Sequence, residues 1–465
     1  MAPCFSKLFS EAMDCLGYSE QMIGFRAYIL KEIFDVASER FTRILQTEMI
    51  PAGSKSEGVV PFMGSDFDTM IVSQFLICVD HGRLENKMFI IVTDTNECPP
   101  GYTKLRPLVP GHCTGIPSML NSGYLDYIPS ATISEMFKNM DIPSVHDGYK
   151  QRYKTLSGPA LSSILQFNAL FGVKQTDASY DNVIAIRYYT STILREWAER
   201  SRQFDWPPPD VIEDVSTTEG YIVPVGHKFS EEQSLEWRIC FTTGERKLVS
   251  SFNSTQLKLY VVLKMVVKDI LKPVVDCVSS YMVKNIVFWV MEHNPTFVFT
   301  PSNLTKCVIH ALWFLLHCLH NNNLPNYMIP NRNLLLGRIQ GKQKAELRDL
   351  TRELLNEGET IVLKCEKLKN AMYVAESSRT LASMVQSWRD EIEQLYLLFS
   401  LKLIQNCTSN MVWRRSFLAD AVFEYFRDES YLPIICRLLY LLSFNMSTGG
   451  NFFQNVMDVL HNLLS

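Results

Sequence analysis

The stretch GSKSEGVVPFMGSDFDTM, residues 53 to 70, contains the pattern from which the fold can be predicted. It opens with a Gly-Ser pair and ends with Asp66 and Asp68, and the apolar residues that follow predict a strand. Side chains two apart on a strand point to the same face, so these two carboxylates would repel each other without a cation between them. Hard oxygen ligands suit Mg²⁺ or Mn²⁺. An exposed turn is the alternative, because Gly, Ser and Asp are common turn residues.

The bulk composition indicates a globular protein with more than one core. The chain has 465 residues, of which 47% are hydrophobic and 20% charged. A chain of this length favours two domains or one large bilobed enzyme. The net charge of −4 gives no overall sign of a nucleic-acid-binding protein, although a local basic surface remains compatible with it.

Cysteine usage and hydropathy together predict a cytoplasmic location. The 12 cysteines are scattered and form no Cys-x-x-Cys pair, which fits a reducing compartment and disfavours a disulfide scaffold or a zinc ribbon. The first residues lack the basic and apolar run of a signal peptide. No uncharged apolar run is long enough to cross a bilayer, so we expect no membrane interaction.

Periodicity divides the chain into a mixed part and a helical part. Apolar residues at helical spacing predict one long amphipathic helix over 19–47, and short β-rich runs follow between 59 and about 190. Most of the later sequence predicts helices, at about 276–292, 303–321, 343–357, 359–370, 375–405 and 410–465.

The predicted fold class is therefore α+β and bilobed. A mixed β-sheet lobe contains the long N-terminal spine helix, and an all-helical C-terminal lobe follows. We expect a first lobe over 1–235, a helical lobe that completes the site over 236–345, and a C-terminal helical extension over 346–465.

The Gly-Ser pair has a chemical role if the two aspartates hold a metal. Gly53 permits close backbone approach, and Ser54 offers a hydroxyl and an N–H to an anion. A phosphate cradle beside a metal site is what nucleotidyl transfer requires. A third carboxylate is expected from a later strand. Asp181, at the head of DNVIAIRYY, is the first candidate and Asp177 the second, while a turn aspartate at a strand end is the alternative.

These residues resemble the animal nucleotidyltransferase superfamily that contains cyclic GMP-AMP synthase, the cyclic GMP-AMP synthase-like receptors and the Mab-twenty-one proteins. Gly53, Ser54, Asp66, Asp68 and Asp181 match its signature in order. The resemblance implies that the three aspartates are catalytic and hold two Mg²⁺ or Mn²⁺ ions. It also implies that the Gly-Ser pair binds the donor triphosphate, and it points to an invertebrate member of the mollusc type.

The resemblance extends to about residue 340 and implies five nucleotide-binding residues in the second lobe: Arg238, Glu245, Lys264, Ser280 and Tyr281. Arg238 would contact a base, Lys264 and Ser280 would hold phosphate, and Tyr281 would stack on a base. Cys240 stands where the family has serine, which leaves one polar base contact open. The alternative for Lys264 is the solvated face of a helix, although its neighbours on both sides are apolar, and Tyr281 without the resemblance indicates a core position.

The family also implies an activity and its partners. The expected enzyme joins two nucleoside triphosphates, ATP and GTP first, into a cyclic dinucleotide that acts as a second messenger of innate immunity and is read by a receptor. Double-stranded RNA docking on the spine helix is the expected activator. Two alternatives stay open: an inactive binding or scaffold protein with the same fold, and a nucleotidyltransferase that acts on RNA ends or on protein.

No structural zinc is expected. The zinc thumb of the vertebrate synthase is replaced here by RKLVSSFNSTQ, which has no Cys or His. The dense Cys and His run CVIHALWFLLHCLH does not have zinc-finger spacing, and its apolar neighbours indicate a packed helix. Between residues 238 and 284 basic side chains outnumber acidic ones, which suits a triphosphate substrate.

Overall fold

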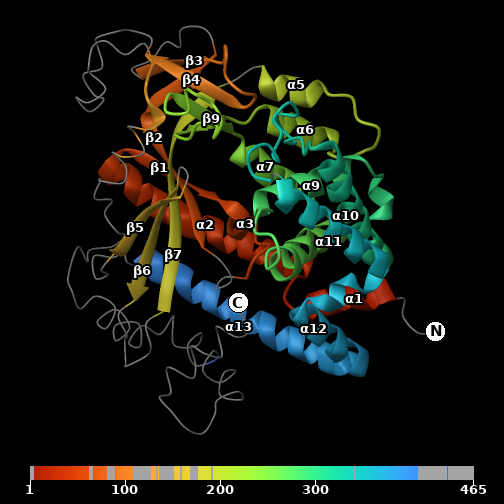
Figure 1. Ribbon diagram of the computed structural model, residues 1–465. Coiled ribbons are helices and arrows are strands. Elements are labelled where there is room, and N and C mark those ends of the chain that lie inside the picture. The colour runs from red at the N-terminus through yellow and green to blue at the C-terminus, as the bar shows by residue number, and fades with distance from the viewer. Residues whose placement is uncertain are drawn as a thin grey trace.

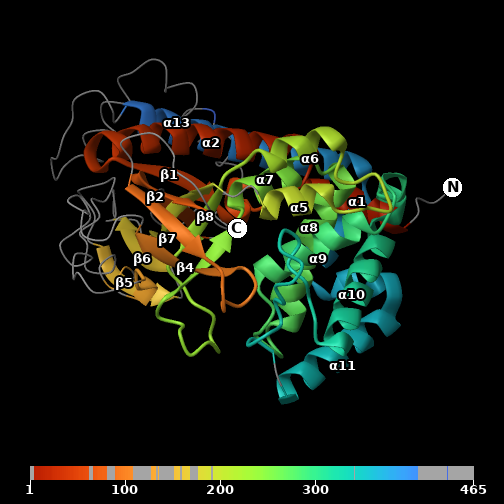
Figure 2. The ribbon, with the colours of Figure 1, turned by 90° about the horizontal axis from the view of Figure 1, so that it is seen from above.

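The chain combines one large sheet with a helical part in a computed structural model (Figures 1 and 2). The structure describes residues 5–61, 66–80, 89–107, 127–131, 133, 135, 151–157, 160–167, 176–189, 192–339, 341–406 and 437. The sheet and the long helix α2 occupy one side, and α5 to α11 gather on the other. The mixed α and β content of the predicted fold class is thus present.

Nine strands form the sheet in the described part of the chain. They are β1 (Thr47–Ala52), β2 (Phe67–Val79), β3 (Phe89–Asp94), β4 (Tyr102–Pro107), β5 (Gln151–Ser157), β6 (Ala160–Phe167), β7 (Thr176–Tyr189), β8 (Gly220–Val223) and β9 (Glu236–Cys240). Their order is β1-β2-β3-β4-β9-β8-β7-β6-β5, and β2 also pairs with β7 in parallel. The predicted strands MIVSQFLICV and NVIAIRYY are confirmed as parts of β2 and β7, and FIIVTD, the described part of KMFIIVTD, is β3.

The predicted spine helix is confirmed as α2 (Glu20–Leu45). The Oγ atom of Ser19 accepts a hydrogen bond from the Met22 N–H at 3.3 Å, which caps the first turn. The helix ends at Gln46, whose backbone is left-handed with φ 53°. The turn into β1 therefore places the end of α2 directly beside the sheet.

The remaining helices are mostly in the C-terminal half. They are α1 (Phe5–Cys15), α3 (Gly53–Ser56), α5 (Ile193–Glu199), α6 (Pro209–Ser216), α7 (Thr242–Ser250), α8 (Ser254–Val266), η2 (Val267–Leu271), α9 (Ser280–Glu292), η3 (Thr296–Val298), η4 (Pro301–Asn303), α10 (Leu304–Asn321), α11 (Gly341–Glu357), η5 (Gly358–Lys364), α12 (Glu366–Ser377) and α13 (Arg379–Asn406). The packed helix expected from CVIHALWFLLHCLH is α10, and burial raises the pKa of its Cys307 thiol to about 11. No helix among the described residues has the length and apolar character needed to span a membrane.

Two predicted helix boundaries are wrong. Residues 358–364 form a 3-10 helix, and the helix expected over 375–405 is divided at Ser378. The backbone of Ser378 is extended, and its Oγ atom accepts a hydrogen bond from the Leu381 N–H at 3.3 Å, so this serine starts a new helix. The helix predicted over 410–465 lies outside the described residues.

The C-terminal helix α13 packs along α2 through an apolar cluster and a buried ion pair (Figure 1). Arg26 and Glu393 are both fully buried, with 2.7 Å between the Arg26 Nη2 and Glu393 Oε2 atoms. Arg26 also donates to the carbonyl oxygens of Gly17 at 2.6 Å and Gly58 at 3.2 Å. One guanidinium therefore joins α13, α2 and the loop after α3.

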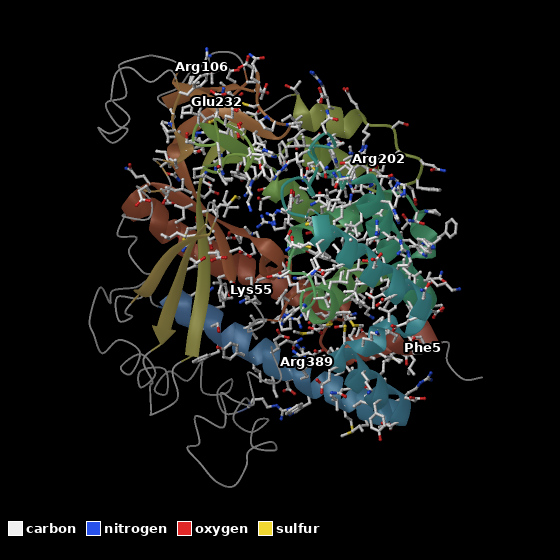
Figure 3. All side chains as sticks on the ribbon, viewed as in Figure 1. Phe5, Lys55, Arg106, Arg202, Glu232 and Arg389 are labelled. Carbon is white, nitrogen blue, oxygen red and sulfur yellow. The ribbon has the colours of Figure 1, made fainter. Side chains whose placement is uncertain are left out.

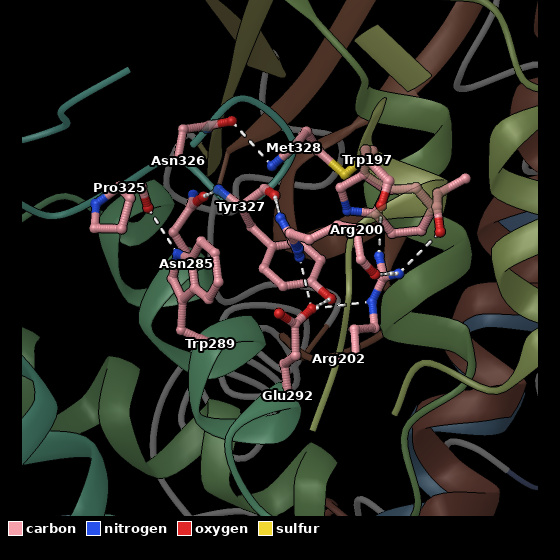
Figure 4. A network of polar contacts seen from close by, with 11 residues as sticks. Trp197, Arg200, Arg202, Asn285, Trp289, Glu292, Pro325, Asn326, Tyr327 and Met328 are labelled. Carbon is pink, nitrogen blue, oxygen red and sulfur yellow. Dashed lines mark hydrogen bonds and ion pairs between the residues drawn. The ribbon is translucent and has the colours of Figure 1, made fainter. Parts of the chain in front are cut away.

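A second buried network fixes α5 against the helical part (Figure 4). The Glu292 carboxylate accepts hydrogen bonds from Arg200 at 2.6 Å, Arg202 at 3.2 Å and the Tyr327 hydroxyl at 2.7 Å. The backbone N–H of Tyr327 donates to the Asn285 side chain at 2.7 Å. The loop after α10 is thereby held against α9.

Candidate active site

Two of the three predicted aspartates are neighbours on adjacent strands. Asp68 on β2 and Asp181 on β7 are register partners in a parallel pair. The Ser162 hydroxyl, on β6, donates a hydrogen bond to Asp181 Oδ1 at 2.6 Å. Side chains of register partners lie on one face of a sheet, so the fold directs both carboxylates to a common place.

The third aspartate lies at the edge of this arrangement. Asp66 is exposed and precedes β2, whose pairing with β7 begins at Phe67. That strand alternation places Asp66 and Asp68 on one face stays a prediction, because Asp68 lies within β2 whereas Asp66 immediately precedes it. In the described part of the chain, no three His, Cys, Asp or Glu side chains gather closely enough to hold a metal ion.

The carboxylates nevertheless act on one another electrostatically. The pKa of Asp68 is raised to about 6, first by burial and then by the charges of Asp181 and Asp66. The positive charges of Lys284 and Lys264 oppose this rise. Repelled carboxylates that offer hard oxygen atoms fit a divalent cation such as Mg²⁺ or Mn²⁺, with Asp68 and Asp181 as the paired ligands.

The Gly-Ser pair lies directly against this site. Gly53 has φ +69°, and a Cβ atom there would lie 1.8 Å from Asp68 Oδ2, so only glycine fits. Ser54 follows at the start of α3, with its Oγ atom 3.5 Å from the Tyr260 hydroxyl. The Gly-Ser pair predicted as a phosphate cradle is thus adjacent to the predicted metal ligand.

Lys55 is a site residue that sequence reasoning missed. It is buried between the sheet and the helical part, and its Nζ atom lies 3.6 Å from the centre of the Phe67 ring (Figure 3). Burial lowers the pKa of Lys55 to about 8, against the attraction of Asp66 and Asp68. Its position next to Ser54 in the quoted stretch was the available signal.

A buried row of charged side chains continues from this cradle. The Lys284 Nζ atom lies 2.5 Å from Glu57 and 3.5 Å from Glu245. The Tyr281 hydroxyl donates to Glu245 at 2.8 Å and accepts from the Asn326 side chain at 2.8 Å. Glu57 and Lys284 were missed, because their pairing joins residues that are far apart in sequence.

Contacts therefore link the aspartate end of the site, formed by Asp68 and Asp181, to the tyrosine end, formed by Tyr281 and Glu245. Tyr260 bridges the two groups, since its hydroxyl lies within 3.5 Å of Ser54 and donates to Glu57 at 3.3 Å. Lys264 lies one turn further along α8, with its Nζ atom 5.7 Å from the Tyr260 ring centre. Burial lowers the pKa of Lys264 to about 8, although Glu57 favours its charge.

The other predicted residues lie at the margins of this row. Ser280 is exposed at the first position of α9, where its neighbour Ser279 caps the helix by accepting from Met282 N–H at 3.3 Å. Arg238 is on β9, opposite Tyr102 on β4.

Two secondary candidates have separate outcomes. Asn333 belongs to YMIPNRNLL, residues 327 to 335, which resembles a Mab-twenty-one motif. Its side chain accepts hydrogen bonds from the Leu324 and Leu335 N–H groups and so holds its own loop. The side chain of the reserve carboxylate Asp177 lies outside the described residues.

A comparison with known protein families matches the helical segment that carries Lys264 and Tyr281. Residues 253–355 match the family model described as the Mab-21 protein HhH/H2TH-like domain. The matched segment runs from the start of α8 through α9 and α10 into α11. This match supports the Mab-21 (Mab-twenty-one) family, which is related to nucleotidyltransferases and implies a nucleotidyltransferase-like fold.

Proposed function

We propose that this chain is a metal-dependent nucleotidyltransferase that joins two nucleoside triphosphates into a cyclic dinucleotide. The observation that carries the proposal is the pairing of Asp68 with Asp181 across two parallel strands, with Gly53 packed against Asp68. A carboxylate pair beside a close-approach glycine is the arrangement that nucleotidyl transfer needs. The Mab-21 match supports the superfamily and leaves the specific reaction to this proposal.

The aspartate end of the site is the proposed metal-binding part. Asp66, Asp68 and Asp181 would hold two Mg²⁺ or Mn²⁺ ions. When bound, such ions neutralise phosphate charge and lower the pKa of an attacking hydroxyl. Asp66 lies just before β2, and its charge contributes to the raised pKa of Asp68, so its carboxylate is the proposed third ligand.

The phosphates of the donor nucleotide would lie between the two ends. Gly53 and Ser54 would bind them with backbone and hydroxyl groups, and Lys264 and Ser280 would contribute from the helical part. Lys264 has a lowered pKa because it is buried, and an anion beside it would restore its charged form. Triphosphate binding and protonation of Lys264 would therefore favour each other.

The bases would lie at the tyrosine end. Arg238 would donate hydrogen bonds to one base and Tyr281 would stack on another. Glu245 and Asn326 both bond the Tyr281 hydroxyl, so the ring orientation is fixed before any ligand enters. A fixed ring loses little conformational entropy on binding.

Double-stranded RNA remains the proposed activator, and a cyclic dinucleotide receptor of innate immunity the proposed reader of the product, in the cytoplasm. Fewer basic side chains of α2 are available to RNA than its sequence contains. Arg26 is fully buried and paired with Glu393, so it is unavailable to RNA. Lys31 is exposed and pairs with Asp35 at 2.6 Å.

One observation favours a second candidate, an inactive binding or scaffold protein. The three predicted metal ligands do not gather into a three-ligand group within the described residues. A protein that kept the fold without catalysis would bind nucleotides through the tyrosine end and Lys264, without needing the aspartates.

The test is incubation of the purified protein with labelled ATP, GTP, CTP and UTP and Mn²⁺, with and without long double-stranded RNA. Asp68→Asn and Asp181→Asn variants would run beside it, and Asp349→Asn, at an exposed position of α11, is the matched control. We expect a phosphatase-resistant product from the wild-type protein and the control only. Nucleotide binding without any product, in a folded protein under every ligand, would favour the scaffold candidate.

A further inference from the structure

Two arginines flank one aromatic ring beside the proposed site, and a third lies close enough to repel them. Arg238 on β9 is the register partner of Tyr102 on β4. The Arg332 guanidinium, from the loop after α10, lies 5.4 Å from the centre of the Tyr102 ring. A Cβ atom on Gly101 would lie 2.7 Å from the Arg332 Cδ atom, so glycine permits this approach.

The third arginine, Arg338, shares the electric field of the other two. Although Arg338 reaches solvent, partial burial of its guanidinium and then the positive charges of Arg238 and Arg332 lower its pKa, while Tyr102 opposes. The ion pairs seen among the described residues include none of these three arginines. Three positive charges therefore lie together without a carboxylate partner in the part of the chain that the structure describes.

The rim of this arginine cluster is aromatic and open to solvent. His227 contacts the Tyr102 ring edge-on, with 5.4 Å between ring centres. Phe229 is 59% exposed, and a Cβ atom on Gly337 would lie 2.2 Å from its ring, so the two loops touch. Arg338 is itself exposed, so a ligand can reach the cluster from solvent.

The cluster is connected to the tyrosine end of the proposed site. The backbone N–H of Asn326 donates to the Arg332 carbonyl oxygen at 2.8 Å, and its side chain donates to the Tyr281 hydroxyl at 2.8 Å. Burial and then Glu245 raise the pKa of Tyr281, and Arg332 opposes them. A ligand that stacked on Tyr281 would have its charged groups within reach of the arginines.

We propose that Arg332 and Arg338 bind the phosphate groups of a second nucleotide, beside Arg238, which contacts the base. An uncharged base would leave at least two of the three positive charges uncompensated, whereas a triphosphate carries several negative charges. The planar guanidinium group also matches phosphate oxygens in pairs. The identity of the ligand as a nucleotide rests on the proposed function, while the anion site rests on the arginines themselves.

The test is isothermal titration of the full chain in EDTA, so that divalent cations do not contribute. The ligands are ATP, tripolyphosphate, adenosine and a short single-stranded RNA. The variants are Arg332→Gln and Arg338→Gln, with Arg352→Gln on exposed α11 as the matched control. Thermal unfolding of each variant reports whether it is folded.

We expect each cluster variant to bind ATP and tripolyphosphate about tenfold more weakly or worse. Adenosine binding and the Arg352 control should be unchanged. Equal ATP affinity in folded variants would overturn the proposal, and so would an equal loss for adenosine, because the phosphates would then have no role. RNA that binds more tightly than ATP, and weakens in the variants, would overturn the nucleotide as the occupant.

The same variants separate this inference from the proposed function. If the wild-type protein makes no cyclic dinucleotide and the arginine variants still lose ATP affinity, the proposed reaction fails and the anion site stands. If product forms with the same KM in the wild-type protein and both variants, the reaction stands and the arginine cluster has no part in it.

Discussion

Replacing Asp68 with asparagine is expected to stabilise the protein at pH 8 when no divalent cation is present. Asp68 is partly buried, and its pKa of about 6 lies about 2 units above the usual value of 3.8. Each unit corresponds to about 1.4 kcal/mol, so the ionised carboxylate destabilises the folded state by about 3 kcal/mol at pH 8. Asparagine has nearly the same shape and removes this charge.

The pH dependence gives the sign of the effect. Because the folded-state pKa is raised, the wild-type protein regains this stability as the pH falls through about 6 toward 4. The variant should therefore be more stable by about 1 to 3 kcal/mol at pH 8, and equal to the wild-type protein near pH 4. Urea unfolding in EDTA at both pH values measures the difference.

Added Mn²⁺ should reverse the order. A cation that binds only the folded state stabilises it by about 2.7 kcal/mol at a hundred times its dissociation constant, and the variant should lose most of this gain. The Asp349→Asn control should follow the wild-type protein. Suppose that in EDTA the Asp68→Asn variant has a lower free energy of unfolding than the wild-type protein, and that the difference is the same at pH 8 and pH 4. That result would refute the repulsion between carboxylates.

Four further predictions concern contacts at the site and along α2. Gly53→Ala should lose the stabilisation by Mn²⁺ and unfold about 1–2 kcal/mol more easily, because its φ of +69° and its contact with Asp68 exclude a Cβ atom. Gly24→Ala, where a Cβ meets nothing within 4 Å, should stabilise α2 by about 0.5–1 kcal/mol in the same urea assay. Lys264→Met should be about 3 kcal/mol more stable than the wild-type protein at pH 7, because the lowered pKa of about 8 means that the charged ammonium destabilises the folded state. This gain in stability should vanish by about pH 10.5. The same variant should bind ATP more weakly in titration calorimetry. Glu393→Gln should lower the free energy of unfolding by about 3–5 kcal/mol, since it leaves the Arg26 charge buried without its partner; a loss below 1 kcal/mol in urea unfolding would contradict this.

Local signals in the sequence were sufficient for some elements and insufficient for others. The helical spacing of apolar residues predicts α2, and β-rich runs predict β2 and β7. The pairing of Asp68 with Asp181 depends on strand register between distant segments, which periodicity does not encode, so their proximity came only from the family resemblance.

Two site residues and one helix boundary were missed for different physical reasons. Glu57 and Lys284 interact across more than two hundred residues, and each alone looks like an ordinary surface charge in sequence. The helix boundary at Ser378 was missed because a serine inside a helical pattern becomes a cap only through its backbone conformation, which neighbouring residues do not specify.

The buried contact between Arg26 and Glu393 has a consequence for the order of events during synthesis. The two residues are separated by 367 positions, so the arginine leaves the ribosome long before its countercharge exists. Arg26 also donates to the carbonyl oxygen of Gly58, in the loop after α3, which begins with Gly53. A nascent chain can build the strands as they emerge, but the loop beside Asp68 acquires its final support only when α13 has been made. The proposed nucleotide site would thus gain this support from a helix that is made after every residue assigned to the site.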